Sequence, residues 1–240
     1  MPRADGRKVN ELRPVEMTTG FVKFAEGSVL IRCGDTVVLC NASVEERTPL
    51  HVKPGHGWVT AEYSMLPRAN RERSRRDVDK LKLSGRSAEI QRLVGRSLRA
   101  AVDLSLLGER TVTVDCDVIQ GDGGTRTASV TGGFVALALA CQKLVDEGYI
   151  GRSPIKHYVA GISAGIVDDT PMLDLQYSED SRAQVDLNCI MNELGEIIEV
   201  QGTGEGRSFT LREQQELVEL CAKGNRELIR KQKEILGHIR

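Results

Sequence analysis

Residues 130–145, VTGGFVALALACQKLV, are apolar on nearly every side of the helix that their composition favours. A helix without a polar face must be covered by other elements, so this segment predicts the buried centre of a packed domain. The preceding run, TVTVDCDVI at residues 111–119, alternates in the manner of a strand. The glycine-rich residues between the two segments are therefore predicted to form a strand-to-helix loop.

The first part of the chain predicts sheet followed by an irregular segment. The runs 28–33 and 36–44 flank a Gly-Asp turn and predict a hairpin. Proline and glycine interrupt residues 48–60, and residues 61–85 are polar enough to predict a mobile surface segment. Apolar residues at helical spacing then predict a helix over 87–104. Its outer face is cationic and carries Arg92, Arg96 and Arg99.

The second half of the chain predicts antiparallel sheet and a final helix. Four β-runs separated by turn signals predict a meander, over residues 153–167, 171–177, 183–191 and 196–202. Residues 211–236 predict the last helix. Because no repeat or linker divides the chain, we expect a single domain over residues 1–240, of the α+β class.

Composition predicts a globular protein of the cytoplasm that does not enter a membrane. Of the 240 residues 40% are apolar, enough to bury a core. The first ten residues are polar, and no uninterrupted apolar run approaches the roughly 20 residues that a membrane span needs. The cysteines form no C-x-x-C pair and most lie in apolar runs, which predicts buried thiols in a reducing compartment.

The charge of the chain is unevenly distributed. The formal net charge is −1, yet residues 68–99 hold eleven basic and four acidic side chains, a local charge of +7. The rest of the chain carries −8. A basic stripe on an acidic protein suits a polyanionic partner such as RNA.

The loop GDGGTRT, residues 121–127, fits neither the P-loop nor the dinucleotide-binding pattern. Its glycines allow backbone N–H groups to turn outward at a helix start, and Arg126 adds a planar fork of donors. A cation there opposes the helix dipole unless an anion lies between them, so we expect a phosphate-sized anion. Arg86, at the start of the 87–104 helix, poses the same conflict and is expected to share that anion. A capped loop and a solvated arginine are the simpler alternatives.

Asp180, in a turn, and Asp186, in the next β-run, are a second candidate site. Neighbouring strands could bring these carboxylates together to hold Mg²⁺ or Mn²⁺ through oxygen ligands, or to act as acid and base. The pattern by itself favours solvated side chains instead. Asp115 and Asp117 are rival carboxylates that share one face of a strand, where structural hydrogen bonding is an equal alternative. The histidines show no metal spacing, and no G-x-S-x-G motif supports a hydrolase triad.

Six segments of the chain, in order, resemble the bacterial ribonuclease PH family, and DGGTRTAS and EIQRLVGRSLRAA are the most specific. The resemblance implies the ribonuclease PH fold (ribosomal protein S5 domain 2-like), with mixed and antiparallel sheets packed with helices. It implies a phosphorolytic 3′-to-5′ exoribonuclease that trims tRNA precursors, releases nucleoside diphosphates and runs backwards as a nucleotidyltransferase. It also implies a homohexamer built as a trimer of dimers.

The same resemblance assigns roles to residues. It implies a site for the co-substrate, inorganic phosphate, at Arg86, Gly124, Thr125 and Arg126. It implies a catalytic pair that binds Mg²⁺ or Mn²⁺ at Asp180 and Asp186, and RNA contacts at Arg68, Arg73 and Arg76. A non-catalytic RNA-binding ring subunit would tolerate loss of either set, and a small-molecule nucleoside phosphorylase would not need the basic stripe. Both sets are complete here, which favours an active enzyme.

Overall fold

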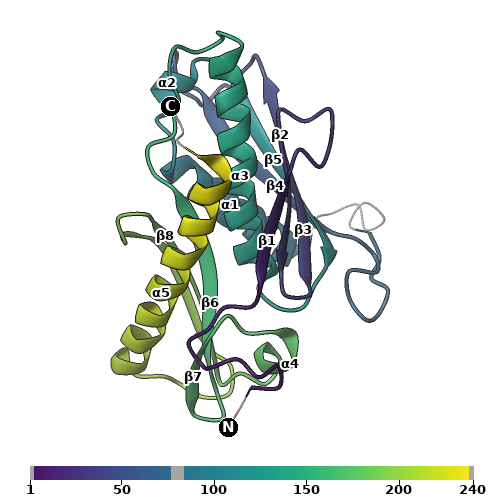
Figure 1. Cartoon of the computed structure of the whole chain (residues 1–240), viewed down its shortest axis with the longest axis vertical. Helices are drawn as coiled ribbons and strands as arrows, with labels where there is room; N and C mark the ends of the chain where they lie inside the picture. Colours follow the sequence, from purple (N-terminus) through teal and green to yellow (C-terminus); the bar gives the residue numbers. More distant parts are fainter. Residues whose placement is uncertain (1–2, 77–83, 238–240) are drawn as a thin grey trace.

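The computed structural model describes residues 3–76 and 84–237, which form two β-sheets with a long helix between them (Figure 1). The first sheet has the order β1-β2-β3-β5-β4, with β1 (Val15–Thr19), β2 (Gly27–Cys33), β3 (Thr36–Glu45), β4 (Trp58–Met65) and β5 (Thr111–Gln120). The second sheet has the order β7-β6-β8-β9, with β6 (Val159–Val167), β7 (Thr170–Leu173), β8 (Val185–Asn192) and β9 (Ile197–Gly204). The predicted hairpin of β2 and β3 is confirmed.

The long helix, α3 (Thr125–Asp146), is the predicted buried helix, and it starts directly after the glycine loop. It packs against β2 and β3 on one side and against β6 on the other. Contact with β2 is close, because a Cβ atom on Gly27 would collide with the carbonyl oxygen of Ala136. By length and composition α3 could cross a membrane, but 78% of its most apolar window is buried inside the protein. Its apolar surface is covered by the two sheets, as expected for the core helix of a soluble protein.

Strand β4 corrects the expectation of an irregular segment over 48–60 and a mobile one from residue 61. Residues from Trp58 to Met65 pair in parallel with β5, and Val59, Ala61 and Tyr63 are buried. The intervening side chains are polar, so the average polarity of the segment resembled that of a loop. Pairing with an apolar neighbour decided the structure.

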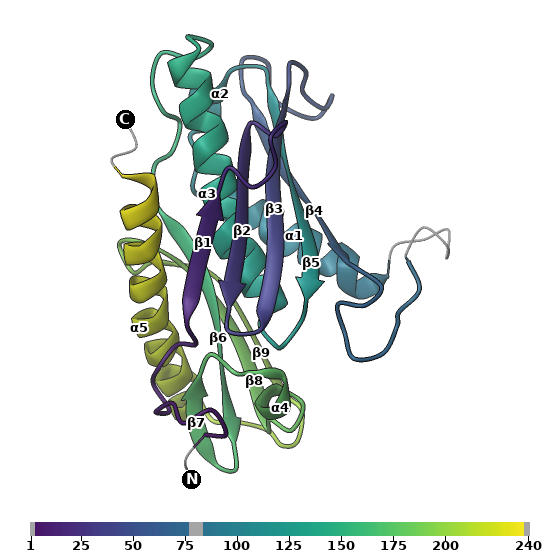
Figure 2. The same ribbon diagram turned by 45° about the vertical axis from the view of Figure 1, so that its right-hand side comes forward.

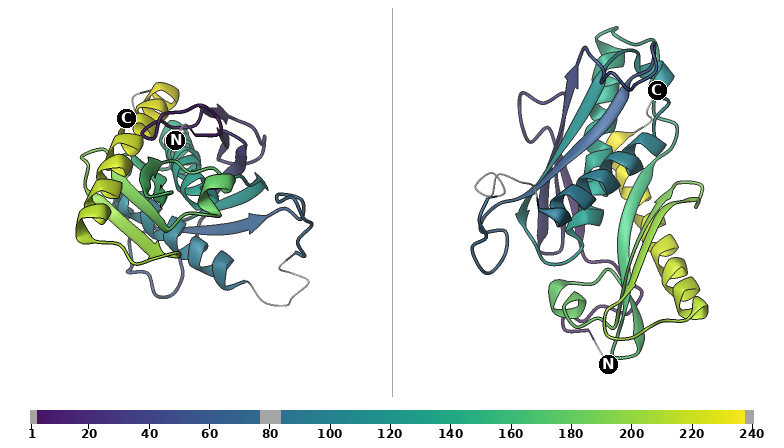
Figure 3. Two further views of the ribbon diagram at one scale, coloured as in Figure 1. Left: turned by 90° about the horizontal axis from the view of Figure 1, so that it is seen from below. Right: turned by 180° about the vertical axis from the view of Figure 1, so that it is seen from behind.

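Helix α1 (Gly85–Ala100) returns the chain from β4 to β5, as a parallel pair requires. It lies over β4 and beside α3, as seen from behind in Figure 3. The helix is shorter than predicted, because Leu104 belongs to a separate turn, α2 (Leu104–Leu107). Arg99 is not on a solvated face either: its guanidinium lies 4.4 Å from the centre of the Trp58 ring and donates a hydrogen bond of 2.8 Å to the Val59 carbonyl.

The second sheet is antiparallel as predicted, but it is not a simple meander. Strand β8 pairs with β6 rather than with β7. The short helix α4 (Tyr177–Asp180) lies in the connection between β7 and β8 (Figure 2). Helix α5 (Leu211–Leu236) packs on β6, β7 and β8. One buried apolar cluster includes residues of both sheets and of α3. The cysteines are all free and buried, as predicted.

Candidate active site

The glycine loop forms the wall of a cavity of about 180 Å³ at the N-terminus of α3. Gly123 and Gly124 have φ angles of 77° and 65°, a left-handed conformation that side chains disfavour. Gly124 is the N-cap of α3 and no side chain caps the helix. Within the described residues, no acceptor binds the backbone N–H groups of Gly124, Thr125 or Arg126. The end of the helix therefore offers unpaired donors to an anion in the cavity.

Arg86 and Arg126, the two arginines that conflict with helix dipoles, line this same cavity. Arg86 lies in the first turn of α1 and Arg126 in the first turn of α3. Arg126 Nη1 donates a hydrogen bond of 3.0 Å to Gln201 and lies 3.2 Å from a carboxylate oxygen of Glu89. An anion in this cavity would lie near both residues, and the expectation that they share one anion stays a prediction.

Asp180, from α4, and Asp186, from the second sheet, also line the cavity. Asp180 ends α4, and Asp186 lies near the start of β8. Burial, followed by the charge of Asp180, raises the pKa of Asp186 to about 6. Burial and the charge of Glu205 raise the pKa of Asp180, although the nearby arginines oppose this. The two carboxylates therefore lie close enough to repel one another, which a bound cation would relieve.

The donor set in this part of the cavity fits a hard divalent cation. The Ser163 hydroxyl, on β6, also lines the cavity and is buried without a hydrogen-bond partner among the residues that the structure describes. Among the described residues, no group of three or more His, Cys, Asp or Glu side chains could hold a metal alone. Mg²⁺ is usually held by one or two carboxylates together with water and substrate phosphates, so a pair of aspartates is a suitable protein contribution.

Several residues that support the site were not predicted from the sequence. Arg3 makes hydrogen bonds of 2.8 and 2.6 Å to both carboxylate oxygens of Glu179, and so fixes the helix that carries Asp180. The Tyr63 hydroxyl, on β4, lies 2.9 Å from the Thr125 hydroxyl. The only local signal for Tyr63 was the alternation of apolar and polar residues along β4.

The proposed RNA-contacting arginines, Arg68, Arg73 and Arg76, are exposed on the segment after β4, and none lines this cavity. Lys80 and Lys82, from the same basic stripe, lie outside the described residues. A larger cavity of about 680 Å³ shares Arg86, Gly124, Thr125 and Asp180 with the first. Its lining also includes Asn70, Arg71, Glu72 and Tyr177. Residues 70–72 of the basic segment therefore line the larger cavity, and RNA contact by Arg68, Arg73 and Arg76 stays a prediction.

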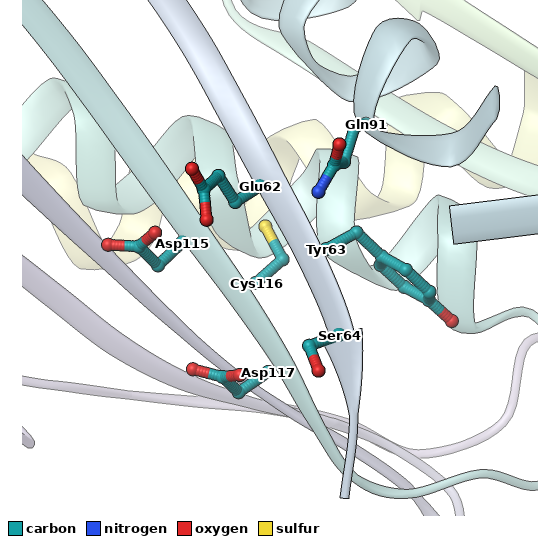
Figure 4. A pocket seen from close by; sticks show the side chains of 7 residues that line it. All are labelled: Glu62, Tyr63, Ser64, Gln91, Asp115, Cys116 and Asp117. Atoms are coloured by element: carbon teal, nitrogen blue, oxygen red, sulfur yellow. The ribbon is translucent and has the colours of Figure 1, made fainter. Parts of the chain in front are cut away.

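The rival carboxylates lie in a different cavity, with Glu62 (Figure 4). Glu62 on β4 is the register partner of Asp115 on β5, and Asp117 is two residues further along. Burial and the charges of Glu62 and Asp117 raise the pKa of Asp115 to about 6. No arginine or lysine lines this cavity within the described residues. In the part of the chain that the structure describes, this cavity therefore has no counterpart of Arg86 and Arg126, the cationic side chains that line the cavity at α3.

Comparison with known proteins agrees with the fold. Two family models match: "3′ exoribonuclease family, domain 1" over residues 11–142 and "domain 2" over residues 157–224. An exosome of Archaeoglobus fulgidus with RNA bound to the active site superposes with a TM-score of 0.81 at 24% identity, covering 95% of this chain and 92% of that one. Rice Rrp46 superposes with a TM-score of 0.78 at 20% identity, covering 98% and 100%. By its two family models, the chain belongs to the 3′ exoribonuclease class.

Sequence similarity narrows the class. Ribonuclease PH of Moorella thermoacetica is 53% identical over 240 residues, which cover 100% of this chain and 96% of that protein. Ribonuclease PH of Syntrophomonas wolfei is 53% identical over 238 residues, which cover 99% of this chain and 100% of that protein. The chain belongs to the ribonuclease PH family. It is a phosphorolytic 3′-to-5′ exoribonuclease with inorganic phosphate as co-substrate, and a non-catalytic ring subunit is not favoured.

Proposed function

We propose that Arg86, Gly124, Thr125 and Arg126 bind inorganic phosphate beside the 3′-terminal phosphodiester of an RNA, and that Asp180 and Asp186 hold Mg²⁺ or Mn²⁺ there. The observation that carries the proposal is the single cavity that both residue sets line. Two guanidinium groups and an uncapped helix N-terminus supply donors for the phosphate oxygens. The cation, when bound, neutralises charge on the scissile phosphate.

In the reaction a phosphate oxygen attacks the phosphorus of the last phosphodiester. The bond from that phosphorus to the 3′ oxygen of the preceding nucleotide breaks, and the terminal nucleotide leaves as a nucleoside 5′-diphosphate. The proton that phosphate gives up balances the one that the 3′ oxygen gains. Phosphate is itself the nucleophile, so the protein contributes placement and electrostatic stabilisation.

We infer that the larger cavity takes the 3′ end of the RNA. Tyr177, which is 54% exposed in its wall, presents a ring on which a base can stack, and Arg71 adds a positive charge. Transfer RNA precursors are the proposed substrates, in the cytoplasm, and the proposed assembly is a homohexamer built as a trimer of dimers. The name of the ribonuclease PH relatives supports an RNA substrate, and the similarity to an exosome supports a ring-shaped assembly.

Substitution of the arginines tests the phosphate site. Arg126→Ala and Arg86→Ala should each raise the phosphate KM steeply, because loss of a charge-assisted contact costs roughly 2 to 3 kcal/mol. RNA affinity, measured without phosphate, should stay nearly intact. Arg92→Ala is the matched control, since Arg92 is an exposed arginine on the same helix as Arg86 and lines neither cavity. Unchanged phosphate dependence in both variants would remove the two arginines from the site.

A further inference from the structure

The face of the glycine loop that does not line the cavity is held by two side chains from distant parts of the chain. Arg13 Nη1 donates a hydrogen bond of 2.6 Å to the Asp122 carbonyl, and Nη2 one of 3.4 Å to the Gly123 carbonyl. The Thr36 hydroxyl donates a bond of 2.7 Å to the same Gly123 carbonyl and accepts one of 2.9 Å from the Asp122 N–H. Neither Arg13 nor Thr36 lines either cavity.

We propose that Arg13 and Thr36 are positioning residues for phosphate binding, which they promote by fixing the carbonyl side of the loop. In a trans peptide the C=O of one residue and the N–H of the next point in opposite directions. Bonds that hold the Gly123 carbonyl therefore turn the Gly124 N–H the opposite way, and Gly124 lines the phosphate cavity. This inference rests on the proposed function of that cavity.

We call Arg13 and Thr36, with their hydrogen bonds to the loop, the clamp. The clamp is rigid because Arg13 is itself fixed. Its Nε and Nη2 groups bond to the Asp174 carboxylate at 3.1 and 2.7 Å, and its backbone N–H donates to the same carboxylate at 2.7 Å. Arg13 and Asp174 are 4% and 1% exposed. Because Arg13 is paired with this buried carboxylate and lines neither cavity, we expect the arginine to act on phosphate through loop geometry rather than by direct contact. Without the clamp, two adjacent glycines would have to be ordered each time phosphate binds, which weakens binding.

Thr36→Val tests the proposal, because valine keeps the shape of a fully buried side chain and removes only the hydroxyl. We expect the phosphate KM to rise about tenfold, the factor that corresponds to about 1.4 kcal/mol, while kcat stays within about twofold. Thr36→Ser, which retains the hydroxyl, should restore the phosphate KM. Thr111→Val is the matched control: Thr111 is buried, bonds to the Arg47 carbonyl at 2.6 Å, and pairs with Glu45 at the opposite end of β3. It should lower the melting temperature without changing the phosphate KM.

A phosphate KM that is unchanged in Thr36→Val, with a melting temperature lowered as in Thr111→Val, would overturn the proposal. If Thr36→Val does not fold, Arg13→Lys takes its place, because lysine keeps the charge beside Asp174 but loses the fork that reaches both carbonyls. The same rise in phosphate KM is expected, and a wild-type KM would again overturn the clamp. Failure of the proposed function would look different, since Arg126→Ala would then leave phosphate dependence unchanged.

Discussion

At the scale of single residues, the charge of Asp180 and Asp186 should matter more than their shape. Asp180→Asn and Asp186→Asn keep the shape of the side chain and remove the negative charge that would attract a cation into the cavity. We expect kcat to fall at least about a hundredfold in each variant, a common cost of removing one electrostatic group from an active site. RNA affinity should change less than about twofold, and the response of the rate to added Mg²⁺ should be blunted.

Direct binding of Mn²⁺, followed by electron paramagnetic resonance, separates this role from a loss of folding. Asp168→Asn is the matched control, because Asp168 is an exposed carboxylate in the turn between β6 and β7. A variant of Asp180 or Asp186 that binds Mn²⁺ and responds to Mg²⁺ like the wild type would mean that the carboxylate does not hold the cation.

At the scale of elements, the carboxylates on β4 and β5 should make stability depend on pH. The pKa of Asp115 rises from 3.8 to about 6 in the folded protein, where Glu62 and Asp117 are the charged groups nearby and Asn41 faces it from β3. A raised pKa means that stability present at low pH is lost as the pH rises from about 4 to about 6. Asp115→Asn should therefore be more stable than the wild type at pH 7.5, and the difference should vanish near pH 4.

The size of that gain follows from the exposure of the carboxyl. The full shift would correspond to about 3 kcal/mol, but Asp115 is half-exposed and screened, so about 1 kcal/mol is expected. That gain corresponds to roughly 2 to 4 °C in melting temperature for a chain of this size. Calorimetry across pH measures it, with Glu16→Gln on β1, the opposite edge of the sheet, as the control. A pH-independent difference between Asp115→Asn and wild type would contradict the assignment.

At the scale of the whole molecule, the basic stripe on an otherwise acidic chain should hold RNA through its phosphates. Each phosphate contact to a single strand contributes about −0.7 to the slope of log affinity against log salt. Neutralising Arg73 and Arg76 together should therefore flatten that slope by up to about 1.4, with little change in sequence preference. If the proposed hexamer brings several stripes around one RNA, the loss should be larger on a tRNA precursor than on a short oligonucleotide.

Salt titrations on both RNAs measure this, and sedimentation of the wild type measures the mass of the assembly. Neutralising Arg47 and Arg152, which are exposed and lie outside the stripe, is the control. An unaltered salt slope on the long RNA would mean that Arg73 and Arg76 do not hold substrate.

The sequence by itself determined the elements whose signals are local. The apolar composition of residues 130–145 required a buried helix, and the hairpin of β2 and β3 and the helix over residues 211–236 followed from periodicity and turn residues. The glycine pair and the position of Arg126 predicted an anion site because conformational freedom and the helix dipole depend on near neighbours. The resemblance to a family then predicted that Asp180 and Asp186 belong to the same active site.

Only the tertiary structure decided the rest, because it depends on contacts between residues far apart in the chain. Strand β4 is a strand because β5 lies beside it, and β8 pairs with β6 although β7 is nearer in sequence. Arg13 and Asp174 are separated by 161 residues, and no periodicity or turn signal links them. A buried ion pair of this kind exists only after both sheets have removed it from water, since the same two charges are nearly independent in the unfolded chain.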